Sequence, residues 1–77
     1  MKSVKIYSTE SCVYCKMVKE FFDKNNVKYE EKDVSKDEKS RAELVEKSGQ
    51  TGVPVIDIEG EIVIGYDKEK IKRILGL

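Results

Sequence analysis

The sequence predicts an α/β domain in which a four-stranded mixed sheet carries helices on both faces. Apolar, β-branched runs that suit strands alternate along the chain with segments whose apolar residues recur at helical spacing. The order of these segments is strand, helix, strand, helix, strand, strand, helix (βαβ-α-ββα). No repeat or linker interrupts the 77 residues, which predicts one small domain over residues 1–77.

The first strand and the first helix are expected close to the amino terminus. Apolar and polar residues alternate from Val4 to Tyr7, as in a half-buried strand. Helical spacing follows in Met17, Val18, Phe21 and Phe22. We expect a helix from about Cys12 to Lys24, ended by Asn25 and Asn26, because asparagine tolerates left-handed turns.

The middle of the chain predicts an edge strand and a second helix. Residues 27–32 alternate but are rich in charge, which suits the edge of a sheet, where charge discourages unwanted pairing. Ser35 and Glu38 have the spacing of a capping box, which predicts that a helix begins there. Its modest apolar face ends before Gly49.

The last third predicts a hairpin and a closing helix. Residues 53–58 and 61–64 are apolar strands separated by Glu59-Gly60, a turn that makes them antiparallel. Asp67 is the expected N-cap of the last helix, whose buried stripe is Ile71, Ile74 and Leu75. The first strand–helix–strand unit should be a right-handed parallel crossover.

Composition excludes several functions. The 15 basic and 15 acidic residues cancel, which gives no electrostatic case for nucleic acid or an anionic membrane. Without histidine, a Cys-His hydrolase and a Cys₂His₂ zinc site are both impossible within the chain. No signal peptide, membrane-length apolar stretch or phosphate-binding glycine loop is visible, so the cytoplasm is the expected location.

The only two cysteines, Cys12 and Cys15, lie three residues apart, between the predicted first strand and the start of the predicted first helix. Unpaired N–H groups and the helix dipole favour a thiolate at that position, so Cys12 is the expected nucleophile and Cys15 the resolving thiol. Metal binding is a second interpretation, and a passive disulfide is a third. So short a loop stabilises a fold by only about 2 kcal/mol, and cytoplasmic cysteine pairs are seldom structural.

Two further motifs join the cysteine pair in a resemblance to a known family. Pro54, the only proline, opens the third strand after Val53, and Gly65-Tyr66-Asp67 follows the fourth. Alone, the proline is an ordinary strand opener. Together the three motifs resemble the glutaredoxin family of the thioredoxin superfamily, along essentially the whole chain. The resemblance implies a thioredoxin-like fold and a small dithiol redoxin with a Cys-Val-Tyr-Cys active site.

The resemblance also implies roles for individual residues. The Val53–Pro54 bond is expected to be cis and to face the cysteines, while the backbone of Val53 pairs with the substrate. Tyr14 is the aromatic residue of the family motif. The segment Gly65-Tyr66-Asp67 would hold the γ-glutamyl end of glutathione.

The chain departs from the family pattern around this expected glutathione site. Thr9 replaces a basic residue that would meet the glycyl carboxylate, although Gln50 can still form a hydrogen bond there. Ile64 and Lys68 replace a glycine and an acid, and Val13 replaces a proline. We therefore expect glutathione to bind more weakly than in a typical family member, with little effect on the redox chemistry.

The sequence thus predicts a monomeric thiol–disulfide oxidoreductase that reduces protein disulfides or glutathione mixed disulfides. Glutathione is the expected co-substrate, and no tightly bound cofactor or metal is expected. One alternative is a redoxin that is reduced by a thioredoxin-type reductase and serves a specific reductase such as ribonucleotide reductase. A further alternative is an iron–sulfur or metal carrier, in which Cys12 thiolates of two chains and two glutathiones bridge the cluster.

Overall fold

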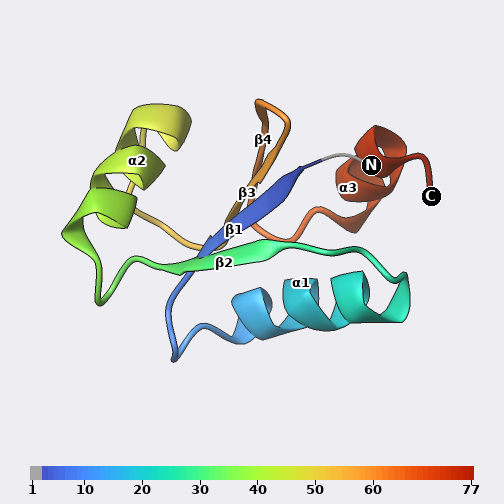
Figure 1. The fold of residues 1–77 in the computed structure, drawn as a ribbon, viewed down its shortest axis with the longest axis horizontal. Helices are drawn as coiled ribbons and strands as arrows, with labels where there is room; N and C mark the ends of the chain where they lie inside the picture. The colour runs from blue at the N-terminus through green and yellow to red at the C-terminus, as the bar shows by residue number, and fades with distance from the viewer. Residues whose placement is uncertain (1–2) are drawn as a thin grey trace.

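The computed structural model describes residues 3–77. Met1 and Lys2, the first two residues of the predicted domain, lie outside the described residues. The elements follow the predicted order along the chain (Figure 1). They are β1 (Val4–Ser8), α1 (Val13–Lys24), β2 (Glu30–Asp33), α2 (Glu38–Ser48), β3 (Val55–Ile58), β4 (Glu61–Ile64) and α3 (Lys68–Leu75).

The four strands form one mixed sheet in the order β2-β1-β3-β4. The β1–β2 pair is parallel, whereas the β1–β3 and β3–β4 pairs are antiparallel. The charged strand β2 is an edge strand, as its composition predicts. Helix α2 lies on one side of the sheet and α1 on the other (Figure 1). The predicted α/β class with helices on both faces is therefore confirmed.

Alternate residues of the strands build two cores, one on each face of the sheet. The larger core joins α1 and α3 to the sheet through Val4, Ile6, Val18, Phe21, Phe22, Ile56, Ile58, Val63 and Ile71. The smaller core, under α2, contains Tyr7, Val34, Leu44 and Val55. Phe21 and Phe22 are thus core residues, and successive residues of β1 face opposite helices.

Two strands begin later than the sequence predicts. β2 begins at Glu30 instead of Val27, because the Val27 N–H already donates to the Phe22 carbonyl at the end of α1 (2.9 Å). β3 begins at Val55 instead of Val53, because Pro54 has no N–H with which to donate an inter-strand hydrogen bond.

The predicted capping box at Ser35 and Glu38 is wrong. Asp37 is the N-cap of α2, and its side chain accepts hydrogen bonds from the Lys39 N–H (3.2 Å) and the Ser40 hydroxyl (2.7 Å). The Ser35 hydroxyl donates instead to Asp33 (2.5 Å), so that it belongs to the preceding turn. Aspartate and serine are both good N-caps, and here Asp37, two residues after Ser35 and directly before the helix, is the cap.

Candidate active site

Strand register brings separate parts of the chain to one end of the sheet. Tyr7 lies opposite Val55, and Val55 lies opposite Ile64. The residues just beyond these pairs therefore lie together, and the Gly65 N–H donates to the Pro54 carbonyl (2.8 Å). The turn that carries the first cysteine also leaves β1 at this end. All three sequence motifs thus lie at the same end of the sheet.

Cys12 is the N-cap of α1 and is partly exposed. Its sulfur accepts a hydrogen bond from the backbone N–H of Cys15 (3.1 Å), and its own N–H donates to the Thr9 carbonyl (3.3 Å). The helix dipole adds partial positive charge at the same place. The Cys12 sulfur therefore lies at the helix end that the sequence predicts, with a backbone N–H directed at it.

Cys15 lies one turn further along α1 and is fully buried. Burial, followed by the hydrogen bond with the Cys12 side chain, raises the pKa of the Cys15 thiol to about 12. A backbone hydrogen bond from Thr9 and the charge of Lys19 act in the opposite direction. The two thiols of the pair therefore differ sharply in accessibility, and Cys15 is protonated at neutral pH.

The surface around Cys12 is open and partly apolar. A shallow cavity of about 150 Å³ is lined by Glu10, Ser11, Cys12, Val13 and Lys16. The side chains of Val13 and Tyr14 are 68% and 60% exposed, although both belong to the first turn of the helix. A disulfide can therefore reach the Cys12 sulfur from solvent.

The proline and the Gly65–Asp67 segment form the other part of this region. The Val53–Pro54 peptide bond is cis, as predicted, and Pro54 is buried. Asp67 is the predicted N-cap of α3, and one carboxylate oxygen accepts from the Lys70 N–H (3.2 Å). Between α1 and the start of α3 lies a cavity of about 240 Å³, lined by Met17, Glu20, Phe21, Lys24, Tyr66 and Lys68.

Two predicted contact residues, Thr9 and Gln50, are less closely tied to the site. Thr9 takes part through its backbone, which hydrogen-bonds both cysteines. The Gln50 side chain donates to the Gly52 carbonyl (3.4 Å) and thus folds over its own loop. Ligand roles for these two residues, and for Tyr14, Val53, Gly65, Tyr66 and Asp67, stay predictions.

The sequence does not reveal two polar networks that run from helices to strands. On the α1 side, Glu31 accepts hydrogen bonds from Ser8 and Lys19. On the α2 side, Lys47 donates to Tyr7 and Asp57. The only sign of these networks in the sequence is a polar residue at a strand position where the alternation predicts a buried one. Ser8 and Asp57 are such residues.

Residues 3–77 contain neither a metal-type cluster of side chains nor a membrane-spanning helix. Within that range no three cysteine, aspartate or glutamate side chains gather as they would around a metal ion. No helix in the same part of the chain is long and apolar enough to cross a membrane.

Comparison with known proteins decides the family. The glutaredoxin family model matches residues 4–63. The chain belongs to the glutaredoxin family. A glutaredoxin-like 8.6 kDa protein from the rubredoxin operon of Clostridium pasteurianum is 40% identical over 72 residues, covering 94% of this chain and 96% of that protein. Glutaredoxin 3 of Escherichia coli is 33% identical over 67 residues, covering 87% and 81%.

Solved structures agree with this assignment. A mutant of the thioredoxin-like protein BC3987 has a TM-score of 0.91 at 39% identity, covering 99% of this chain and 97% of that one. A buckwheat glutaredoxin–glutathione complex has a TM-score of 0.76 at 27% identity, covering 97% and 71%. The glutaredoxin-like chain therefore has the predicted thioredoxin-like fold, and its family chemistry is thiol–disulfide oxidoreduction.

Proposed function

We propose that this glutaredoxin-like chain reduces disulfides in proteins, or mixed disulfides with glutathione, with Cys12 as nucleophile and Cys15 as resolving thiol. The difference between the two sulfurs carries the proposal. A nucleophilic cysteine must be ionised and within reach of the substrate, and Cys12 is a partly exposed N-cap with an N–H on its sulfur. A resolving thiol needs only to reach the first sulfur, and Cys15 is buried one turn away.

The reaction then has two exchange steps. The Cys12 thiolate attacks one sulfur of the substrate disulfide, forming a mixed disulfide and releasing the other substrate sulfur as a thiolate. Cys15 loses its proton and attacks the Cys12 sulfur, which forms the Cys12–Cys15 disulfide and releases the second substrate thiolate. The substrate gains two electrons and, in water, two protons. Two glutathione molecules return the enzyme disulfide to the dithiol and become glutathione disulfide.

Glutathione is the proposed reductant in a cytoplasmic setting, where thiols are kept reduced. A family member from buckwheat forms a complex with glutathione and shares this fold over nearly the whole chain. The proposed site runs past Tyr14, along the backbone of Val53 and Pro54, to the Gly65–Asp67 segment. Thr9 and Gln50 are the proposed neighbours of the glycyl carboxylate.

A thioredoxin-type reductase is the second candidate electron donor. The observation that favours it is exposed apolar surface beside the site, where Val13, Tyr14 and Ile64 are 68%, 60% and 52% exposed. Such surface suits contact with a protein more than contact with a small polar peptide. On this proposal the chain accepts electrons from one protein and passes them to another, such as ribonucleotide reductase.

A turnover assay that compares the two electron donors tests both proposals. NADPH consumption is followed with a disulfide substrate, supplied either with glutathione and glutathione reductase or with thioredoxin reductase. Cys12→Ser should abolish turnover with either donor, whereas Cys15→Ser should retain glutathione-dependent turnover only. If neither donor supports turnover and the purified protein absorbs in the visible range, the iron–sulfur carrier is the better proposal.

A further inference from the structure

The buried thiol of Cys15 lies beside a polar network that the exchange chemistry above leaves unused. Cys15 precedes Lys19 by one helical turn, so that both side chains lie on the same face of α1. Thr9, whose backbone hydrogen-bonds the Cys15 thiol, directly follows Ser8 at the end of β1. The network and the thiol thus meet where β1 ends and α1 begins.

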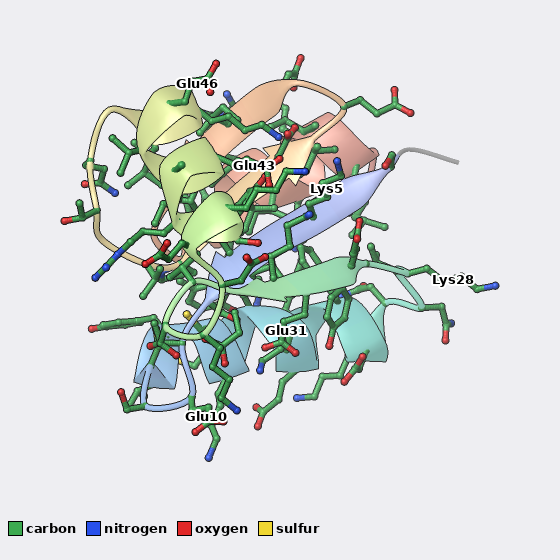
Figure 2. All side chains as sticks on the ribbon, turned by 60° about the vertical axis from the view of Figure 1, so that its left-hand side comes forward. Lys5, Glu10, Lys28, Glu31, Glu43 and Glu46 are labelled. Carbon is green, nitrogen blue, oxygen red and sulfur yellow. The ribbon has the colours of Figure 1, made fainter. Side chains whose placement is uncertain are left out.

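The network joins one helix to two strands. The Lys19 ammonium lies 2.7 Å from Glu31 Oε2, and the Ser8 hydroxyl donates to the same oxygen (2.8 Å). Ser8 is fully buried, whereas the Lys19 and Glu31 side chains are 26% and 42% exposed. Figure 2 shows Glu31 extending from β2 toward α1. The Ser8 hydroxyl therefore fixes the Glu31 carboxylate, and that carboxylate fixes where the Lys19 charge lies.

The charged groups near Cys15 can be named element by element. On α1, they are Cys12 and Lys19. On the β2 side, Glu31 contacts Lys19, and Tyr29 and Asp33 act on that pair. From α3, Lys68 lies over the Phe21 ring, and Asp57 of β3 faces α2 on the opposite side of the sheet. Burial is the largest influence on the pKa of this thiol, and Lys19, one turn away on the same face of α1, is the cation that favours its ionised form.

The resolving step requires this thiol to ionise. Burial disfavours the Cys15 thiolate, and a nearby ammonium favours it. Glu31 opposes the ammonium, because its carboxylate partly cancels the field of Lys19 at the sulfur. Glu31, itself held by the Ser8 hydroxyl, also keeps the ammonium in place. The two members of one ion pair therefore act on Cys15 with opposite sign.

We propose that Lys19, positioned by Glu31 and Ser8, lowers the pH at which Cys15 resolves the mixed disulfide. This inference rests on the proposed function, since it assigns the tuning of its second step. In that step Cys15 S–H loses a proton, the Cys15–Cys12 S–S bond forms and the bond from Cys12 to the substrate sulfur breaks. The departing substrate thiolate takes up a proton from solvent, so protons and electrons balance. Lys19, Glu31 and Ser8 touch no reacting atom and are positioning residues.

A two-phase reaction with 5,5′-dithiobis(2-nitrobenzoate) separates the steps. Attack by Cys12 releases the first thionitrobenzoate, and attack by Cys15 on the mixed disulfide releases the second. Stopped-flow traces over a range of pH give a midpoint for the second phase. The variants are Lys19→Met, Lys19→Arg and Glu31→Gln, with Lys28→Met as the matched lysine control because Lys28 is exposed and points away from the molecule (Figure 2).

The expected shifts have opposite signs. Lys19→Met should move the second-phase midpoint upward by about 0.5 to 1 pH unit. Glu31→Gln should move it downward, because the amide oxygen can still accept from Lys19 and Ser8 while the opposing charge is gone. Lys19→Arg should restore the wild-type midpoint, and Lys28→Met should leave it unchanged. Because both variants break the same ion pair, a purely structural role would move the midpoint in one direction for both.

Three results would overturn the inference. Unshifted midpoints, or shifts of the same sign in Lys19→Met and Glu31→Gln, would overturn it while leaving the dithiol mechanism intact, because the second release still occurs. A wild-type protein that releases the first thionitrobenzoate and never the second would overturn the resolving role of Cys15 and this inference together.

Discussion

Replacing Lys47 with methionine should destabilise the fold through the polar network under α2. The Lys47 ammonium donates to Asp57 Oδ2 (2.6 Å) and to the Tyr7 hydroxyl (3.0 Å). The Asp57 side chain is only 11% exposed, and Tyr7 is fully buried. Methionine keeps most of the apolar stem of lysine, so that the substitution removes the charge and two hydrogen bonds with little loss of packing.

The size of the effect follows from burial. Removing one member of a fully buried ion pair costs about 3 to 5 kcal/mol, because the other charge is left without a partner. Lys47 is 30% exposed, so water can replace part of the ammonium, and the Gly60 N–H still donates to Asp57 (2.7 Å). We therefore expect a loss of about 2 kcal/mol in the free energy of unfolding.

Urea unfolding near pH 7 measures this loss. The midpoint should fall while the slope with denaturant stays unchanged, since the surface exposed on unfolding is the same. Lys32→Met is the matched control. Lys32 lies 3.6 Å from Glu43, whose side chain is 32% exposed against 11% for Asp57, so its loss should cost less than about 1 kcal/mol.

The stability that the Lys47–Asp57 pair contributes should be lost at both low and high pH. Burial alone raises the pKa of Asp57, but hydrogen bonds from Lys47 and Gly60 lower it overall, below its ordinary value of 3.8. The Asp57 contribution is therefore present above that value and is lost as pH falls through the folded-state pKa. The hydrogen bond to Asp57 raises the pKa of Lys47, so the lysine contribution is lost only as pH rises through its folded-state pKa, above 10.5.

A double variant identifies the cause of the loss. Asp57→Asn added to Lys47→Met removes the unpaired carboxylate and should recover part of the stability that the single variant loses. If Lys47→Met costs no more than Lys32→Met, or if the double variant is less stable than Lys47→Met alone, the network does not act through charge pairing.

Three further outcomes are expected at the active site. Iodoacetamide at mildly acidic pH should label Cys12 before Cys15, as peptide mapping would show, and faster labelling of Cys15 would contradict the assigned roles. Thr9→Lys should lower the KM for glutathione by at most about fivefold, a gain of about 1 kcal/mol for an exposed contact; an unchanged KM would place the carboxylate elsewhere. Asp67→Asn should keep the N-cap and the melting temperature yet raise that KM, whereas Asp67→Ala should also cost about 1 kcal/mol of stability.

The fold was largely predictable because its elements carry strong local signals. Alternation in β1 and helical spacing in α1 and α3 fix which faces are buried, and the Glu59-Gly60 turn, with φ values of 50° and 94°, fixes the hairpin. The errors lie at boundaries. Val27 fits a strand pattern, but its N–H is already bonded at the helix end. Ser35 fits the pattern of an N-cap, but Asp37, two residues later, is the N-cap.

The geometry of the candidate site was predictable only where a short motif specifies it, and the roles of its residues stay predictions. The positions of Cys12, Pro54 and Asp67 follow from short motifs within the predicted topology. Lys19 and Glu31, by contrast, are twelve residues apart and look like solvated surface charges in a charged segment. Their meeting depends on how β2 lies beside β1 under α1, which no local pattern encodes.

The three-residue spacing of the cysteines is itself sufficient to make the two sulfurs different. An N-cap side chain accepts from the N–H of the second or third helical residue, and here that third residue is Cys15. The amide that stabilises the Cys12 sulfur thus belongs to the residue that carries the resolving thiol. One turn of helix turns the Cys15 side chain inward, where burial keeps it protonated. One turn of helix therefore gives a partly exposed sulfur that accepts an N–H and a buried thiol whose pKa is raised, which is the asymmetry that the proposed mechanism uses.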